Sequence, residues 1–160
     1  MPNSNLDDLD RKILRLVAQD ARIPFLEVAR ICNVSGAAIH QRMQKLQQSG
    51  VLKGSQFVIA PEALGFETCA YIGLYLKDPS HFDRVVDELR KIPEVVECHY
   101  TTGSFDMFIK IYARNNHHLL TIIHDKLQPL GLSRSETIVS FNAVINRQLP
   151  IADMFEGEEE

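Results

Sequence analysis

The spacing of apolar residues changes along this chain, and the change restricts the fold more than any other feature does. Near the N-terminus Leu6, Leu9, Ile13 and Leu16 recur three or four residues apart, which is typical of an amphipathic helix. From residue 67 onward apolar residues alternate as in strands, with two helical stretches between the strands. A chain of 160 residues can hold two small domains. The pattern therefore predicts an α+β protein with a helical first part and a mixed second part.

Three helices are predicted in the first part, and capping or breaking residues bound them. Asp7 is placed to cap the first helix, with Asp10 three residues later as its partner. A short second helix is expected at 24–32 and a third at 36–49, before Gly50. The segment VLKGSQFVIA, residues 51–60, has the composition of a strand. Pro61 and Gly65 then mark a linker.

The second part reads as strand, helix, strand, strand, helix and strand. The segments are expected at residues 67–77, 80–92, 95–102, 105–113, 116–131 and 135–149. The order βαββαβ predicts a ferredoxin-like sandwich, in which two helices cover one face of an antiparallel sheet. Apolar residues on the other face predict self-association. We name Tyr71, Ile72, Leu74, Val139, Phe141 and Val144 as candidates, without assigning them to one face.

Charge is distributed unevenly between the two parts. The whole chain carries a net charge of −4. Residues 1–60 carry eight basic and five acidic side chains, whereas residues 61–160 carry nine basic and sixteen acidic ones. The acidic end EGEEE accounts for part of the difference, so chance asymmetry is one interpretation. The other is that the basic N-terminal part contacts a polyanion such as nucleic acid.

The third predicted helix has the composition of a helix that enters a major groove. Ile39, Met43 and Leu46 form its buried stripe, and polar or small residues face away from it. Ser35 is a favourable N-cap, and Asn33 suits a left-handed turn between two helices. Glutamine can pair with adenine, and arginine or lysine with guanine or phosphate. The residues predicted to contact DNA are Ser35, Ala37, Ala38, His40, Gln41, Arg42, Gln44 and Lys45. The alternative is an ordinary helical hairpin with a solvated face.

Three stretches resemble the Lrp/AsnC (feast/famine) family of transcription regulators. LDDLDRKIL resembles the opening helix of the family, and EVARICNVSGAAIHQRMQKLQQSGVLKG resembles its helix-turn-helix. YTTGSFDMFIKI resembles the signature of its effector domain. The resemblance covers residues 6–150 and implies a winged or plain helix-turn-helix followed by a RAM-type ferredoxin-like domain. It departs from the family at Asn33, usually glycine, and at Gly36-Ala37-Ala38, where Ser or Pro is frequent. The expected parts are a DNA-binding domain at 1–50, a strand linker at 51–65, an effector and oligomerisation domain at 66–150 and an acidic tail at 151–160.

The same resemblance implies a small amino acid as effector, bound at an interface near the turn before the third strand. The residues implicated are Tyr100, Thr101, Thr102, Gly103, Ser104 and Asp106. Backbone N–H groups and hydroxyls there suit a carboxylate, and Asp106 suits an ammonium group. Alternatively, Asp106 stabilises the turn by accepting backbone hydrogen bonds. The resemblance also implies dimers that form through the sheets, and octamers.

Other classes of protein fit the sequence less well. No nucleophile with a nearby base, glycine-rich phosphate loop or metal-ligand spacing is present, so we expect no catalytic site, cofactor or metal site. The three cysteines are far apart, and no apolar run is long enough to span a membrane, which together favour a cytoplasmic protein. Two alternatives remain: an oligomeric small-molecule-binding module without DNA binding, and an enzyme on the ferredoxin-like sandwich.

Overall fold

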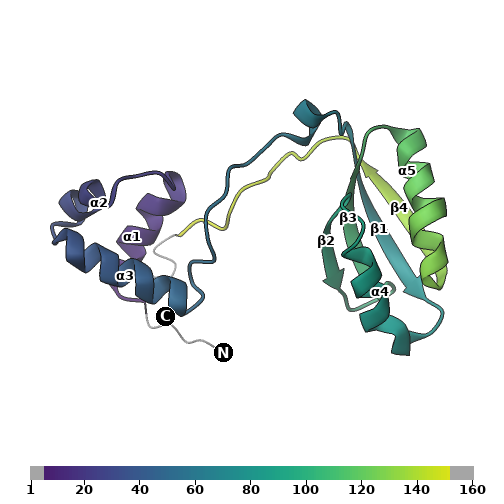
Figure 1. Ribbon diagram of the computed structural model, residues 1–160, viewed down its shortest axis with the longest axis horizontal. Helices are drawn as coiled ribbons and strands as arrows, with labels where there is room; N and C mark the ends of the chain where they lie inside the picture. The colour runs from purple at the N-terminus through teal and green to yellow at the C-terminus, as the bar shows by residue number, and fades with distance from the viewer. Residues whose placement is uncertain (1–5, 152–160) are drawn as a thin grey trace, which may run out of the picture. The chain divides into compact units, whose positions relative to one another are not determined.

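The computed structural model describes residues 6–151 and divides into two compact units. The first unit comprises residues 1–57 together with 147–160, and the second comprises residues 58–146 (Figure 1). In sequence, the second unit is therefore inserted into the first. The predicted acidic tail at 151–160 lies outside the described residues, apart from Ile151.

Three helices build the first unit: α1 (Asp8–Gln19), α2 (Phe25–Cys32) and α3 (Gly36–Gln48). The predicted cap of α1 is confirmed, because Asp7 and Asp10 each accept a hydrogen bond from the other's backbone N–H. Apolar side chains from all three helices form one core, which consists of Ile13, Leu14, Val28, Ala29, Ile39 and Leu46. Ile151 packs against this core, so the chain returns to the first unit after the second unit is complete.

The strand predicted at 51–60 is wrong. This segment forms no ladder, and a short 3₁₀ helix at Pro61–Leu64 follows it. Its apolar side chains Phe57, Val58 and Ile59 are exposed, because strand composition becomes a strand only where another strand supplies hydrogen bonds. All strands within residues 6–151 lie between 68 and 140, so the helix-turn-helix has no β-wing in this part of the chain.

The second unit has the predicted order of strands and helices. Its elements are β1 (Thr68–Leu76), α4 (Phe82–Leu89), β2 (Val95–Tyr100), β3 (Met107–Ala113), α5 (Asn116–Ile122) and β4 (Leu132–Ser140). The strands pair antiparallel in the order β2-β3-β1-β4. Both helices lie on the same face of the sheet (Figure 1). The α+β prediction of a ferredoxin-like sandwich is therefore confirmed.

Two predicted boundaries in this unit need correction. The last strand begins earlier than predicted and ends at Ser140 rather than 149, because its antiparallel partner β1 begins there: Ser140 lies opposite Cys69, and β1 starts at Thr68. The predicted helix at 116–131 ends its α-helical part at Ile122. It continues through a π turn, Ile123–Leu127, and a 3₁₀ turn, Gln128–Leu130.

The structure assigns the two faces of the sheet. Ile72 and Leu74 are fully buried beneath α4 and α5, in the core of the unit. Tyr71 lies on the opposite face, where its ring stacks on that of Phe108 with 5.7 Å between the centroids. Phe141 and Val144 follow the end of β4 and belong to neither face. We call the face that carries Tyr71 and Phe108 the open face.

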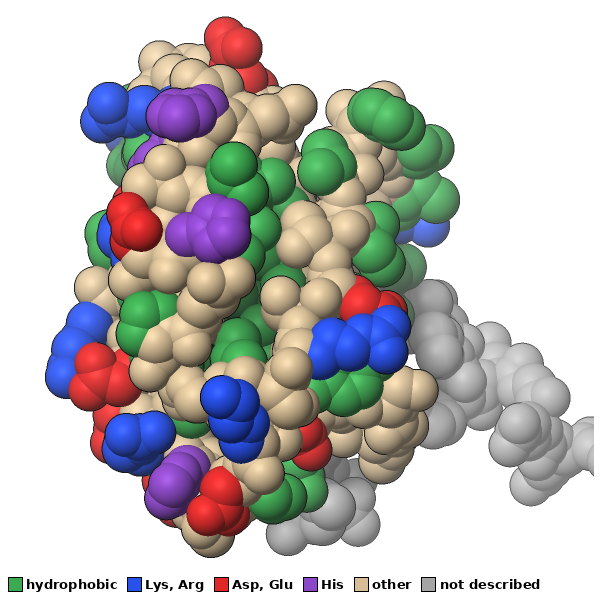
Figure 2. Space-filling model, turned by 90° about the vertical axis from the view of Figure 1, so that its right-hand side faces the viewer, with side chains coloured by type: hydrophobic (Ala, Val, Ile, Leu, Met, Phe, Trp, Pro, Cys, Tyr) green, Lys and Arg blue, Asp and Glu red, His purple; other side chains and the backbone are tan. Residues whose placement is uncertain are grey.

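Figure 2 shows the side of the molecule that lies on the right in Figure 1. Basic and acidic side chains are interspersed over this surface, and hydrophobic side chains show in the central furrow and gather at the upper right of the view. No patch of one charge gathers on the visible part of the described chain. A polyanion would find no continuous basic surface on this side.

Candidate nucleic-acid interface and effector turn

The turn between α2 and α3 has the predicted geometry. Asn33 ends α2 in the left-handed conformation, with φ 55° and ψ 46°. The hydroxyl oxygen of Ser35 accepts a hydrogen bond from the backbone N–H of Ala38, with 3.1 Å between the two atoms, and so caps α3. Both local predictions are confirmed. The turn ends α2, and α3 begins after it as a separate helix.

Most residues predicted to contact DNA lie at the surface of the first unit. The exposed ones are Ser35, Ala37, His40, Gln41, Gln44 and Lys45. Ala38 is half-buried. The buried stripe includes Ile39 and Leu46 at 0 % and 1 % exposure, whereas Met43 is only partly buried. The outer face of α3 therefore presents amides, an imidazole and an ammonium group to solvent.

Arg42 differs from the other predicted contacts because it bonds within the unit. Its Nη1 lies 3.1 Å from Oδ1 of Asp10 and also forms an ion pair with Asp7. Asp10 is fully buried although it is charged. A hydrogen bond from the backbone N–H of Asp10, followed by the one from Arg42, lowers the pKa of Asp7. The hydrogen bonds to Asp7 and Asp10 raise the pKa of Arg42.

Sequence reasoning missed the contribution of α1 to this site. The cap formed by Asp7 and Asp10 was readable, but its link to Arg42, more than thirty residues later, was not. Lys12 of α1 was also missed: its Nζ donates to the carbonyl of Ile31 at 2.9 Å, near the end of α2. Both contacts join residues that are at least 19 positions apart, and no local pattern signals them.

The predicted effector turn is held by its own hydrogen bonds. The hydroxyl of Thr101 donates to the carbonyl of Phe105 at 2.9 Å. The carboxylate of Asp106 accepts from the backbone N–H of Leu76 at 2.7 Å, while the Asp106 N–H donates to the carbonyl of Leu74 at 2.9 Å. Asp106 therefore ties the turn to the end of β1, which favours the structural interpretation of this residue.

The other turn residues are more accessible. Thr102, Gly103 and Ser104 are exposed, and Gly103 has φ 96°, a conformation that L-amino acids with side chains rarely adopt. Tyr100 is 80 % exposed and contacts the ring of Phe82 edge-on, with 4.9 Å between the centroids. The structure thus places Tyr100 beside α4, whereas the carboxylate of Asp106 bonds at the end of β1.

Tyr100 lines a cleft between α4 and β2. The volume of this cleft is about 400 Å³. Most of its lining is apolar, and it consists of Phe82, Val86, Leu89, Arg90, Val95, Val96, Glu97, Cys98 and Tyr100. No sequence pattern predicts this cleft, because it forms only where α4 packs beside β2.

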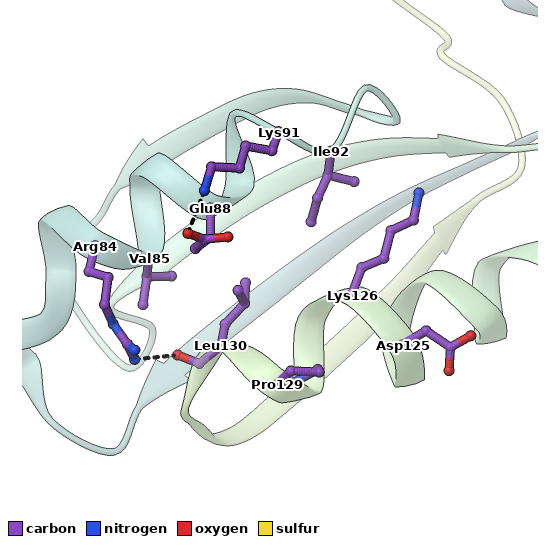
Figure 3. Close-up of a pocket in the computed structure, with 9 residues that line it drawn as sticks. All are labelled: Arg84, Val85, Glu88, Lys91, Ile92, Asp125, Lys126, Pro129 and Leu130. Atoms are coloured by element: carbon purple, nitrogen blue, oxygen red, sulfur yellow. Dashed lines mark hydrogen bonds and ion pairs between the residues drawn. The ribbon is translucent and has the colours of Figure 1, made fainter.

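A second cleft, of about 440 Å³, lies between α4 and the π and 3₁₀ turns that follow α5 (Figure 3). Its three cations already bond to groups of this chain. Arg84 reaches the carbonyl of Leu130 at 3.5 Å, Lys91 pairs with Glu88 at 2.7 Å, and Lys126 bonds to Glu94 at 3.0 Å. An anion that entered this cleft would therefore have to compete with groups of the protein for each of these three cations.

The remaining candidate chemistry is sparse in the described chain. Across residues 6–151, no three His, Cys, Asp or Glu side chains come together as metal ligands would. Cys32, Cys69 and Cys98 are not in disulfides, and burial raises the pKa of both Cys69 and Cys98. None of the helices in this range is both long and apolar enough to cross a bilayer.

Comparison with known proteins agrees with both units. Residues 6–47 match the AsnC-type helix-turn-helix domain, and residues 69–150 match the Lrp/AsnC ligand binding domain. Regulatory protein AsnC of Haemophilus influenzae is 36% identical over 146 residues, which are 91% of this chain and 97% of that protein. HTH-type transcriptional regulator FL11 of Pyrococcus furiosus is 38% identical over 114 residues, 71% of this chain and 75% of that protein.

Solved structures show the same architecture. Escherichia coli AsnC superposes with a TM-score of 0.86 at 31% identity, covering 90% of this chain and 97% of that one. A transcriptional regulator of Neisseria meningitidis, solved in complex with L-methionine, has a TM-score of 0.85 at 20% identity, covering 93% and 99%. The latter identity supports the fold alone. From the matched domains and relatives, this chain belongs to the Lrp/AsnC family and is a DNA-binding transcriptional regulator with a ligand-binding domain.

Proposed function

We propose that α3 reads its operator in the major groove through Gln41 and Gln44. The observation that carries the proposal is that both amides are exposed on a helix whose opposite side is buried. Lys45 would contact phosphate, and Ser35, Ala37, Ala38 and His40 would lie against the backbone or base edges near the start of the helix. Residues 1–50 would form the DNA-binding domain, and residues 51–65 would join it to the effector domain at 66–150.

To test this proposal, a duplex that the wild-type protein binds is first selected from a random pool, and this selected duplex is then used as the probe. Gln41→Ala and Gln44→Ala should each weaken binding to the selected duplex by ~1–3 kcal/mol more than binding to random duplex, because a base contact is lost. Lys45→Ala should reduce the dependence of affinity on salt, as loss of a phosphate contact does. Gln19→Ala, an exposed glutamine of α1, is the matched control and should change neither quantity.

Two outcomes would contradict the proposal. Equal losses on selected and random duplex for the glutamine variants would remove their role in base reading. Failure of the wild-type protein to enrich any duplex would instead favour an oligomeric small-molecule-binding module without DNA binding.

The second unit would sense a small amino acid at the turn of residues 100–106. Two observations support this role. The domain model that matches residues 69–150 is described as the Lrp/AsnC ligand binding domain, and the Neisseria regulator was solved in complex with L-methionine. The exposed backbone of Thr102, Gly103 and Ser104 could donate to a carboxylate, and the adjacent cleft at Tyr100 could take an apolar side chain. In this arrangement Asp106 shapes the turn through Leu76.

Calorimetry against the twenty amino acids tests this sensing role, with wild-type protein and Asp106→Asn compared. We expect one or more amino acids to bind the wild-type protein. Asp106→Asn should lower the free energy of unfolding of the second unit by ~1–2 kcal/mol, because it weakens a charge-assisted hydrogen bond to a backbone N–H. Ser104→Ala, an exposed position in the same turn, should leave the unfolding free energy unchanged.

The opposite pattern would assign Asp106 to the ligand. In that case Asp106→Asn would abolish amino-acid binding and leave unfolding unchanged, because only the charge facing an ammonium group would be lost. If no amino acid binds either protein, the turn has no sensing role.

The regulator would act as a homodimer in the cytoplasm, with octamers as a further assembly. The open face supports the dimer, because it carries exposed or half-buried apolar side chains and is not covered by the helices of this chain. A dimer would also present two copies of α3, which is how helix-turn-helix proteins bind two half-sites.

A further inference from the structure

Asp10 is the one charged side chain that is buried within residues 6–151, and its environment is therefore unusual. Its Oδ2 lies 3.4 Å from the backbone nitrogen of Asp7, and its own N–H donates to Oδ1 of Asp7 at 2.8 Å. These bonds cap α1 but do not neutralise a carboxylate that is shielded from water. A buried charge is costly unless a cation pairs with it.

The cations come from α3. Nη1 of Arg42 lies 3.1 Å from Oδ1 of Asp10 and also bonds to Asp7, and Nζ of Lys45 lies 3.8 Å from Oδ2 of Asp10. The Arg42 side chain is 30 % exposed, whereas that of Lys45 is 63 % exposed. Arg42 is thus the main cationic partner of Asp10, and the ammonium group of Lys45 remains exposed to solvent. The four groups together carry no net charge.

These bonds fix the orientation of α3, which apolar packing alone does not determine. Ile39 and Leu46 hold α3 against the core, but apolar contact is not directional. A guanidinium group that bonds two carboxylates has a defined orientation. Arg42 follows Gln41 directly, so its orientation sets the direction in which the neighbouring amides project from the helix.

We propose that Asp7 and Asp10 position the recognition helix through Arg42, and that Arg42 does not contact DNA. This rests on the proposed role of α3 in base reading. Arg42 is then a positioning residue. The exposed ion pair between Arg30 and Glu27 on α2 offers a matched control, because it lies in the same unit and joins no two helices.

The two roles of Arg42 predict opposite results for Asp10→Asn. If Arg42 contacts phosphate, removal of its carboxylate partner releases the cation, and binding to every duplex is kept or strengthened. If Arg42 positions α3, Asp10→Asn misdirects the amides, and binding to the selected duplex weakens while binding to random duplex does not.

The experiment measures affinity for a duplex selected by the wild-type protein and for random duplex, over a series of salt concentrations. We expect Asp10→Asn and Arg42→Gln each to reduce the ratio of the two affinities by about tenfold, the size of one lost base contact, with no change of salt slope. The double variant should lose no more than either single one, because both break the same link. Arg42→Lys should restore part of the ratio, and Arg30→Gln should leave it unchanged.

A salt slope lowered by about one unit in Arg42→Gln, with Asp10→Asn binding as well as wild type, would overturn the proposal. Amide hydrogen exchange of α3 without DNA gives a second readout. Asp10→Asn and Arg42→Gln should each accelerate exchange in α3 more than in α2, and unchanged exchange in both variants would equally overturn it. If the wild-type protein selects no duplex, the proposed base reading fails while hydrogen exchange still decides the positioning role.

Discussion

Gly73 lies in β1 directly beneath the ring of Phe105, and this contact leaves no space for a side chain. An added Cβ would fall 2.2 Å from two carbon atoms of that ring. Phe105 in turn stacks on Phe108 and meets Tyr75 edge-on, with centroids 5.7 Å and 5.3 Å away. One small residue therefore lets the effector turn lie flat on the open face.

We expect Gly73→Ala to destabilise the second unit by roughly 1–3 kcal/mol, because the ring of Phe105 must move out of a packed cluster. Urea unfolding followed by tyrosine fluorescence measures this unit selectively. All four tyrosines lie in residues 58–146, and the chain has no tryptophan. The additional change Phe105→Leu should recover part of the loss in the Gly73→Ala background. A double variant that is weaker by the full sum of both changes would argue against the steric explanation.

At the scale of elements, the turn from α2 to α3 depends on one residue with a positive φ. Asn33 is the only residue other than glycine with positive φ in the described range. Its N–H bonds to the carbonyls at the end of α2, and the next residue, Val34, donates to Ala29 at 3.0 Å. This closes α2 and starts the turn.

Asn33→Ala should lower the free energy of unfolding of the first unit by about 1 kcal/mol, because alanine tolerates the left-handed conformation less well than asparagine. Asn33→Gly is the matched control and should be neutral or slightly stabilising, since glycine adopts this conformation without strain. Thermal unfolding followed by helical circular dichroism compares the three proteins. Equal losses for both substitutions would instead point to a role for the asparagine side chain.

At the scale of the whole molecule, the open face is the surface most suited to hold two copies together. It carries the stacked rings of Tyr71, Phe108 and Phe105, and Lys110 lies 5.8 Å from the centroid of Tyr71. Ile138 of β4, opposite Tyr71 in the ladder, is 56 % exposed. Aromatic and aliphatic groups of this kind are typical of the centre of an interface.

Light scattering at micromolar concentration should report a dimer or a larger assembly for the wild-type protein. Tyr71→Glu should convert it to a smaller species, because the loss of hydration of a buried carboxylate costs more than its attraction to the nearby Lys110 returns. Leu120→Glu provides the control, since Leu120 is an exposed apolar residue on α5, on the helical face of the sheet. A wild-type monomer, or a Tyr71→Glu protein of unchanged mass, would rule out this interface.

The sequence by itself determined the features that depend on neighbouring residues. The periods of apolar residues predicted three helices and then βαββαβ, and cap and turn residues such as Asp7, Asn33 and Ser35 fixed where helices start and end. Each of these depends on residues a few positions apart, whose interaction is nearly the same in any fold.

Only the tertiary structure decided the features that depend on distant partners. Residues 51–60 have strand composition but no strand beside them, and β4 stops at Ser140, opposite the start of its partner β1. The sequence predicted a DNA contact for Arg42 and left Asp106 open between a ligand contact and a turn-stabilising group. The fold brings Asp10 to Arg42 and the N–H of Leu76 to Asp106. A hydrogen bond or ion pair forms with whichever group the fold brings near, and that choice is not encoded in the residue's own segment.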